Sequence, residues 1–406
     1  MAVTLQSAPP GAPAGMDRRG ISTLAAGHMV VDATTGALPA LLPVFTTIYA
    51  LSDLAASMIV GASLLVSSAI QPLFGILADR RATPLFLWGG VAVGAGFMAV
   101  SGLAGGYAGI MLCVIASGLG IAAFHPEAAR VANRISAGRP ETGLAWFMLG
   151  GNAGFALGPL LAAIAIPFLD ERSTLVFLVP GALVSLWMWH DRSRLAVPVS
   201  RPPRDAIPPP RASTRAIVLL MTVTSMRTWT QFGLLALAPL LLVDDRGFSE
   251  QAAGFAVVAF SGAGAAGTLV GAAIAERIGG REMLISTMPV AAPLVAVFLL
   301  TDGPVSMAAF AATGFVLMAS FSVTVAMGQA YLPGRLALAA GLLIGFGAIG
   351  SAPLGLALFG WIADTAGREA AIWGLALLPL VGASLALLLP APPPAAERRP
   401  IAPAAA

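Results

Sequence analysis

The sequence predicts an all-α membrane protein in which twelve transmembrane helices form two pseudo-symmetric bundles of six. Apolar residues make up 58% of the 406-residue chain and charged residues 10%, against about 25% charged in an ordinary soluble domain. Mean hydropathy is +0.88. The chain also repeats itself: GILADRR at 75–81 is echoed by AAIAERIGGR at 272–281, so that Glu276 follows Asp79 by 197 residues (276 − 79). Duplicated, largely apolar chains are typical of secondary transporters.

Windows of about 20 apolar residues, the length that crosses a bilayer, recur along the whole chain. They place the helices of the first half at 24–50, 54–78, 85–104, 107–132, 143–168 and 174–190. Those of the second half fall at 216–243, 251–275, 283–301, 304–330, 337–362 and 370–390.

The segments between and beyond the spans divide the chain into domains. We expect the bundles to be residues 21–190 and 216–390. Residues 1–20 are rich in Ala, Pro and Gly and have no apolar core of a signal peptide, so they are expected to be a disordered N-terminus. Residues 191–215 hold six Pro and six Arg and are predicted to form a solvated linker. Residues 391–406 form a Pro/Ala-rich tail.

Basic residues predict the orientation in the membrane. All 22 are arginines, and 18 of them fall in the tails, the linker or alternate loops. Under the positive-inside rule, the linker and both termini are therefore cytoplasmic, which an even number of spans requires. The basic linker is read as this topology signal and not as a nucleic-acid site, because no aromatic interleaving accompanies it.

Several classes of function are excluded by what the sequence lacks. The single cysteine, Cys113, cannot form an internal disulfide, and no Cys/His spacing typical of zinc occurs. The three histidines are scattered at 28, 125 and 190, and there is no Walker loop for ATP. We therefore expect no enzyme activity, metal or cofactor. The expected partners are protons, a small-molecule substrate and the lipid bilayer around a monomer, with no nucleic acid.

The two repeated strings carry a resemblance to a known family. GILADRR resembles the signature loop between helices 2 and 3 of the major facilitator superfamily, and AAIAERIGGR its copy between helices 8 and 9. The first copy departs from the pattern, with Ala82 and Pro84 where Gly and a basic residue are usual. The resemblance implies the major facilitator fold and a gating role for the acid–arginine pairs. These pairs are Asp79 with Arg80 and Glu276 with Arg277.

Three further blocks resemble one branch of that superfamily, the bacterial fosmidomycin-resistance exporters. They are FHPEAARVAN at 124–133, GQAYLPGR at 328–335 and the His28-x-x-x-Asp32 spacing in the first span. The resemblance covers residues 22 to 390. It implies a multi-pass protein of the bacterial inner membrane that acts in antibiotic efflux.

His28 and Asp32 lie one helical turn apart and share a face of the first span. Ionisable residues inside a membrane are costly and usually functional, and a carboxyl group removed from water holds its proton more readily. We therefore predict that Asp32 carries the coupled proton and that His28 tunes it. The alternative is a hydrogen-bonded pair that only orients the helix.

The fourth span contains His125, Pro126, Glu127 and Arg130. Pro126 removes an amide donor and is expected to bend or unwind the helix, as happens at transporter binding sites. Glu127 is a second candidate for proton coupling, and His125 for substrate binding. Glu127 and Arg130, three residues apart, can pair, so Arg130 is a candidate gating residue or a partner in a plain surface pair.

Arg227 lies within the seventh span, about as deep as His28 and Asp32 in the first. A fixed guanidinium there suits an anionic substrate, although it could equally be the counter-ion of Asp32 or Glu127. Trp229, Gln231 and, on the tenth span, Gln329 are further candidates for substrate binding.

Glycines recur every fourth residue on the fifth span. Gly150, Gly154 and Gly158, followed by Pro159, predict a smooth face for close helix contact. This face resembles the motif that marks proton-coupled antiporters of the superfamily, which favours export.

Three functions remain open on the sequence. The first is a proton-coupled exporter of small, anionic or amphiphilic compounds. The second is a proton symporter that imports a small organic anion. The third is a membrane sensor or scaffold that transports nothing, against which the intramembrane charges argue.

Overall fold

The computed structural model describes residues 15–51, 53–199, 213–248 and 250–390, and the regular structure within these ranges is helical. Most of the expected N-terminal segment, the centre of the expected linker (200–212) and the expected tail (391–406) lie outside the described residues. The helices of the first half are α1 Arg18–Tyr49, α2 Asp53–Ala69, α3 Gln71–Arg80, α4 Leu85–Val100, α5 Tyr107–Arg134, α6 Pro140–Leu169, α7 Leu178–His190 and α8 Arg192–Leu195. Those of the second half are α9 Thr214–Leu240, α10 Glu250–Ile278, α11 Gly280–Leu300, α12 Gly303–Ala319, α13 Phe321–Tyr331, α14 Leu336–Ala340, α15 Ala352–Ala366 and α16 Arg368–Ala386.

Eleven stretches of the described chain are long and apolar enough to cross a membrane. One of them, Pro140–His190, is 51 residues long and consists of two α-helices, α6 and α7, joined by a 3-10 helix over Asp170–Phe177. The described residues therefore contain twelve stretches of membrane-spanning length, here called passages, and the predicted fold class is confirmed. Three of these passages consist of two α-helices in series, namely α2 with α3, α12 with α13 and α14 with α15.

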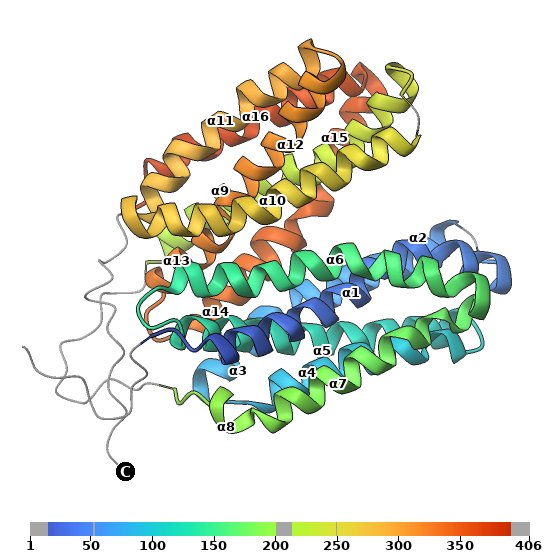
Figure 1. The fold of residues 1–406 in the computed structure, drawn as a ribbon, viewed down its shortest axis with the longest axis vertical. Helices are drawn as coiled ribbons and strands as arrows, with labels where there is room; N and C mark the ends of the chain where they lie inside the picture. The colour runs from blue at the N-terminus through green and yellow to red at the C-terminus, as the bar shows by residue number, and fades with distance from the viewer. Residues whose placement is uncertain (1–14, 52, 200–212, 249, 391–406) are drawn as a thin grey trace, which may run out of the picture.

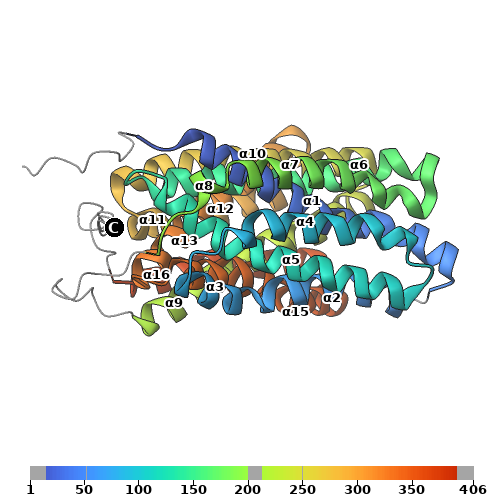
Figure 2. The ribbon, with the colours of Figure 1, turned by 90° about the horizontal axis from the view of Figure 1, so that it is seen from below.

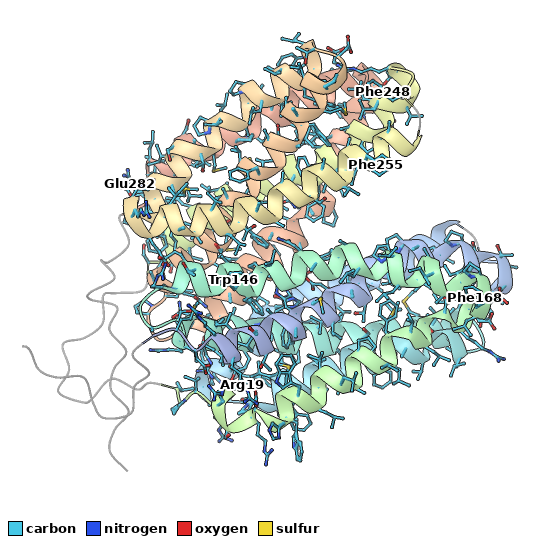
Figure 3. The ribbon with its side chains drawn as sticks, in the orientation of Figure 1. Arg19, Trp146, Phe168, Phe248, Phe255 and Glu282 are labelled. Carbon is cyan, nitrogen blue, oxygen red and sulfur yellow. The ribbon has the colours of Figure 1, made fainter. Side chains whose placement is uncertain are left out.

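The helices form two bundles that lie side by side (Figure 1). One contains α1 to α8 and the other α9 to α16. The bundles meet at the end where α1 begins and α8 lies, here called the linker end, and they diverge towards the other end (Figure 1). A second view shows the helices of both bundles running along one common direction (Figure 2). Arg19 and Glu282 lie at the linker end, whereas Phe168 and Phe248 lie at the opposite end (Figure 3).

The boundaries of the first bundle differ from the prediction at both ends. Helix α1 begins at Arg18, and Asp17 caps it by accepting a hydrogen bond from the Gly20 amide. Beyond α7, Asp191 is buried and accepts two hydrogen bonds from the Arg19 guanidinium, at 2.6 and 2.9 Å. This carboxylate, which the Arg19 guanidinium holds at a pKa below its usual value, fastens the start of the expected linker to the first bundle.

Two local features of the helices bear on the site. Helix α5 runs through Pro126 without interruption, so of the two expected effects of this proline, a bend or an unwinding, the unwinding does not occur. Pro126 removes one helix donor, but the surrounding buried segment Gly120–Ala132 holds the helical path through packing.

In the second bundle, α14 continues into a π-helix over Gly341–Ala348. Such segments are rare and often occur at functional sites.

Candidate functional site

Three ionisable side chains meet in the interior of the first bundle. The Nε2 atom of His28 lies 3.1 Å from Oδ2 of Asp32, and the Nε2 atom of His125 lies 3.3 Å from Oδ1 of the same carboxylate. All three side chains are buried. The His125 contact has ion-pair distance, but its Nε2 is not aligned for a hydrogen bond. The predicted pair of His28 and Asp32 is thus a cluster of three, which also takes His125 from α5.

Backbone carbonyls fix the orientation of both imidazole rings. The Nδ1 atom of His28 lies 2.8 Å from the carbonyl oxygen of Phe147 on α6. That of His125 lies 3.0 Å from the carbonyl oxygen of Ile121. A carbonyl oxygen only accepts, so each Nδ1 must carry the hydrogen. In its neutral form each ring therefore turns the unprotonated Nε2 towards Asp32.

The cluster is held in place by close packing. The ring of His28 stacks on Phe147 with centroids 4.2 Å apart, and it meets the His125 ring edge-on at 4.8 Å. Gly151 of α6 supplies the remaining space, since a Cβ at this position would lie 2.5 Å from Nε2 of His28 and 2.6 Å from Oδ2 of Asp32. Sequence reasoning missed Gly151, although it stands next to the first glycine of the predicted series.

The cluster can hold a cation. One ligand atom from each side chain lies within 4.8 Å of the others, close enough to share a metal ion. Two imidazole nitrogens and a carboxylate oxygen also form a set that binds protons. The sequence alone did not indicate such a cluster, because His125 follows His28 by 97 residues (125 − 28) on another helix.

The glycine series of α6 packs directly on α1. A Cβ on Gly150, Gly154 or Gly158 would collide with the carbonyl oxygens of Ala25, Met29 and Ala33, three successive turns of α1. The predicted role in helix packing therefore has a definite partner. Pro159 follows at the edge of this contact and is half-buried. The close approach is what brings Phe147 and Gly151 of α6 against His28.

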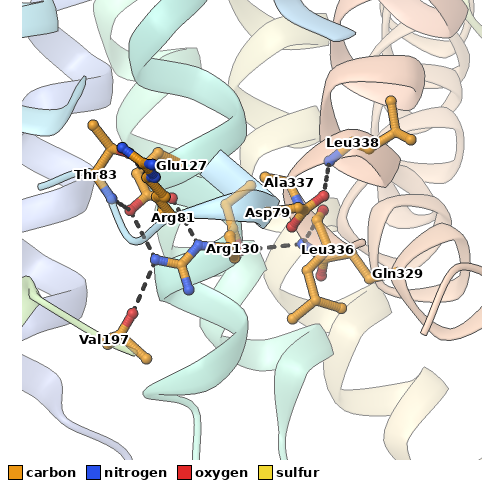
Figure 4. A network of polar contacts seen from close by, with 11 residues as sticks. Asp79, Arg81, Thr83, Glu127, Arg130, Val197, Gln329, Leu336, Ala337 and Leu338 are labelled. Carbon is orange, nitrogen blue, oxygen red and sulfur yellow. Dashed lines mark hydrogen bonds and ion pairs between the residues drawn. The ribbon is translucent and has the colours of Figure 1, made fainter. Parts of the chain in front are cut away.

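Glu127 and Arg130 form a buried pair on another side of α5. The Nε and Nη2 atoms of Arg130 each donate to the Glu127 carboxylate at 2.7 Å. Glu127 also accepts from the amide of Thr83 at 3.3 Å, and Arg130 donates to the carbonyl of Val197 at 3.0 Å (Figure 4). The pair therefore joins α5 to the loop after α3 and to the chain after α8. Glu127 does not join the cluster of Asp32. It follows His125 by two residues on α5, and side chains two residues apart point about 200° apart around a helix.

Arg227 is buried in the second bundle without a carboxylate. Its described partners are Gln231, Thr228 and the Met318 sulfur, and it lies over the ring of Phe321. The structure does not bring it together with Asp32, which lies between two histidines, or with Glu127, which Arg130 holds.

Two of the residues expected to bind substrate lie elsewhere. Trp229 donates from Nε1 to the carbonyl of Ser351 at 2.8 Å, and a Cβ on Gly355 would strike its side chain, so it packs between α9 and α15. Gln329 accepts from Asn133 at 2.7 Å and donates to the carbonyl of Ala129 at 3.2 Å. It therefore links α13 to α5 across the two bundles, at the linker end.

Both acids of the repeated strings reach across to the opposite bundle. The carboxylate of Asp79 accepts from the amides of Ala337 and Leu338, at 2.9 and 2.8 Å, at the N-terminus of α14 (Figure 4). The carboxylate of Glu276 accepts from the amide of Thr142 near the N-terminus of α6, at 3.3 Å, and from Arg139 at 2.8 Å. Acids are stabilised at helix N-termini by the free amides there.

The arginines of the same strings differ from the acids. Arg80 and Arg277 are exposed at the ends of α3 and α10. The acids Asp79 and Glu276 thus hold the bundles together. The cation of the second contact is Arg139, a loop arginine that precedes α6 and is not part of either repeated string. We call these two contacts the Asp79 latch and the Glu276 latch.

Comparison with known proteins gives the chain its family. Residues 24–332 and 220–405 match the sequence profile of the Major Facilitator Superfamily. The chain is 29% identical over 378 residues to the fosmidomycin resistance protein of Escherichia coli (strain K12), covering 91% of this chain and 92% of that protein. It is 30% identical over 375 residues to the uncharacterised MFS-type transporter YfnC of Bacillus subtilis (strain 168), covering 89% of this chain and 90% of that protein.

Its fold is also that of solved members. The crystal structure of the transporter FucP in the outward conformation aligns with a TM-score of 0.74, at 15% identity, over 91% of this chain and 98% of that one. The predicted resemblance to the fosmidomycin-resistance branch is confirmed by the first of the two relatives. With its profile match, its two relatives and its fold in agreement, this chain belongs to the major facilitator superfamily, a family of membrane transporters and not of enzymes.

Proposed function

We propose that this chain exports small anionic or amphiphilic compounds in exchange for protons, by alternating access, and that Asp32 carries the coupled proton. The observation that carries the proposal is the geometry of the buried cluster of Asp32, His28 and His125. The proposed location is the inner membrane of a bacterium, with the linker end in the cytoplasm, as the arginine distribution supports.

The cluster has more acceptors than donors. With both Nδ1 hydrogens used on carbonyls, the neutral cluster directs two imidazole lone pairs and a carboxylate at one another. Each imidazole lone pair lies about 3 Å from a carboxylate oxygen, and such acceptors repel unless a hydrogen or another cation lies between them. A single proton between Asp32 and Nε2 of His28 removes the repulsion of that pair, and its positive charge lowers the repulsion within the whole cluster. Binding of one proton to the cluster is therefore favourable, and we expect its release only where water can enter and solvate the cluster.

Glu127, the second candidate for proton coupling, already forms an ion pair. Glu127 is neutralised by Arg130 through two hydrogen bonds of 2.7 Å. A proton on Glu127 would break a buried ion pair, which typically costs about 3–5 kcal/mol. We therefore assign the proton to Asp32 and give Glu127 a structural role.

The substrate class and the direction rest on other features. Arg227, a buried cation without a described acid partner, supports an anionic substrate. The glycine face of α6 resembles the antiporter motif and packs on the helix that carries Asp32. A relative is named for resistance to an antibiotic, as expected of an exporter. The two latches close the linker end, so the structure would represent the outward-facing state of the cycle.

Transport in inverted membrane vesicles tests this proposal. With an acidified lumen, the native chain should concentrate fosmidomycin, used as the probe, and release protons as it does so. Asp32→Asn keeps the size of the side chain but cannot ionise, so it should abolish uphill accumulation while the protein still inserts and folds. His190→Gln is the matched control, because His190 is exposed at the end of α7.

Three results would contradict the proposal. If Asp32→Asn still builds a gradient that a protonophore collapses, the proton binds elsewhere. Accumulation only in right-side-out vesicles would show import by symport. The absence of both substrate and proton movement for a broad set of organic anions would favour the sensor or scaffold.

A further inference from the structure

Arg227 has the largest fully buried side chain among the described residues. It is 1% exposed, in the middle of α9. None of the described carboxylates forms a salt bridge with it, whereas Arg19 and Arg130 each have one. The face of Phe321, 4.8 Å from the guanidinium carbon, offsets part of the cost of burying this charge. A full positive charge nevertheless remains without a counter-charge.

The hydrogen bonds of Arg227 to described residues leave two of its five N–H donors without a partner. Nη1 donates to Oε1 of Gln231 at 3.0 Å and to the sulfur of Met318 at 3.7 Å, and Nη2 donates to Oγ1 of Thr228 at 3.1 Å. The Nε atom has no partner in the described structure. Since a guanidinium has five N–H donors, the N–H of Nε and the second hydrogen of Nη2 remain.

The same edge binds a carboxylate at two other places in this chain. Arg19 holds Asp191 through Nε and Nη2, and Arg130 holds Glu127 through Nε and Nη2. In both cases two oxygens of one carboxylate meet two parallel N–H groups, the geometry in which arginine recognises oxyanions best. Arg227 presents this edge without the carboxylate.

We infer that the Nε–Nη2 edge of Arg227 binds the anionic group of the transported compound, and that this group is a carboxylate or another oxyanion with a single negative charge. This rests on the proposed function for its assignment to transport. The single charge follows from the balance of the site, since one guanidinium neutralises a monoanion, whereas a dianion would leave a buried negative charge without a partner. Phe321 and Met318 make the wall beside the guanidinium apolar and favour a compound with an aromatic or aliphatic part.

The site lies in one bundle and the proton cluster in the other. The described partners of Arg227 come from α9, α12 and α13, whereas those of Asp32 come from α1 and α5. The compound therefore does not exchange for the proton on a shared group. Coupling passes through the movement of the two bundles.

Binding to the purified full-length chain in detergent tests the inference without any gradient. We choose three probes that share a phenyl ring and differ in charge: benzoate, a monoanion; phenylphosphonate above its second ionisation, a dianion; and benzamide, which is neutral and planar like benzoate. Calorimetry should detect benzoate, with weaker binding of the other two. Arg227→Gln should weaken benzoate binding by about tenfold or more, as expected for the loss of charged hydrogen bonds.

Two further variants keep the result interpretable. Arg227→Lys retains the charge and loses the planar edge, so it should bind benzoate more weakly than the native chain and more tightly than Arg227→Gln. Arg335→Gln removes an exposed arginine of the same bundle and should leave binding unchanged. Thermal unfolding of each variant shows that loss of binding is not loss of the fold.

The inference is overturned if benzoate binds Arg227→Gln as tightly as it binds the native chain, or if phenylphosphonate binds the native chain at least as tightly as benzoate. It is also overturned if benzamide binds equally well, because the charge would then play no part. Since no proton gradient is present, a failure here leaves the proton role of Asp32 standing, and a failure of Asp32→Asn in vesicles leaves this binding result standing.

Discussion

At the scale of single residues, the central observation is that Asp32 lies between two histidines whose other ring nitrogens are held by carbonyls. The sequence could predict half of this arrangement. His28 and Asp32 lie four residues apart, and that spacing alone places them on one helix face. His125 could not be placed there, because its partner depends on the packing of α5 against α1 and on which side of α5 turns inward.

Gly151 provides the space that the side chains of His28 and Asp32 need. A methyl group at Gly151 would enter the space between His28 and Asp32. We expect Gly151→Ala to separate the pair and to lower both the thermal unfolding midpoint and proton-coupled transport, with a cost of about 1–3 kcal/mol from overpacking.

Gly96→Ala is the matched control for this change. Gly96 also lies in a helix of the first bundle, but no atom lies within 4 Å of an added Cβ. Alanine is the better helix former, so this variant should be neutral or slightly more stable. Equal unfolding midpoints and equal transport for the two variants would show that the space at Gly151 does not matter.

At the scale of helices, α1 and α6 act as one unit because three glycines of α6 lie on the backbone of α1. The spacing of these glycines predicted a close contact, and the repeat of four residues suffices for that. The partner helix could not be read from the sequence. The same holds for Trp229 and Gln329: their type indicated a polar cavity, but the rotation of α9 and α13 turns them to α15 and to α5 instead.

The contact of α1 and α6 gives a prediction at this scale. Gly154→Ala would push a methyl group against the carbonyl of Met29, which is backbone and cannot rotate away. We expect α1 and α6 to separate, with loss of about 1–3 kcal/mol of stability and of most transport. Unfolding in detergent and vesicle transport measure the two effects. Gly262→Ala on α10, where no atom is near, is the control, and it should retain both.

At the scale of the whole molecule, two latches related by the internal repeat close the linker end. In each, an acid that follows an apolar span of one bundle reaches the N-terminus of a helix in the other. The sequence predicted the acids as gating residues, and it predicted the twelve passages to within a few residues. It did not predict that Arg80 and Arg277 would lie exposed, because an arginine next to an acid in the sequence need not share its direction.

Weakening one latch should change the balance between the two conformations. Asp79→Asn reduces the attraction to the amides of Ala337 and Leu338, so the bundles should separate more often at the linker end. Spin labels at exposed positions Arg80→Cys and Arg335→Cys, in a chain with Cys113→Ala, would report this as a longer distance. Asp364→Asn, at an exposed position near the opposite end of α15, should leave the distance unchanged. An unaltered distance distribution in Asp79→Asn would show that this contact does not hold the linker end closed.

The Asp79 latch has a consequence for how such proteins diverge. Its donors are the main-chain amides of positions 337 and 338, and every residue except proline supplies such an amide. A substitution other than proline at these two positions therefore keeps the donor, whereas a change at Asp79 removes the acceptor. Packing still restricts the side chain at position 337, where Ala337 is buried, but the latch itself does not require any particular side chain at 337 or 338. Correlated substitution between paired sites, which reveals contacts between side chains, would not reveal this one.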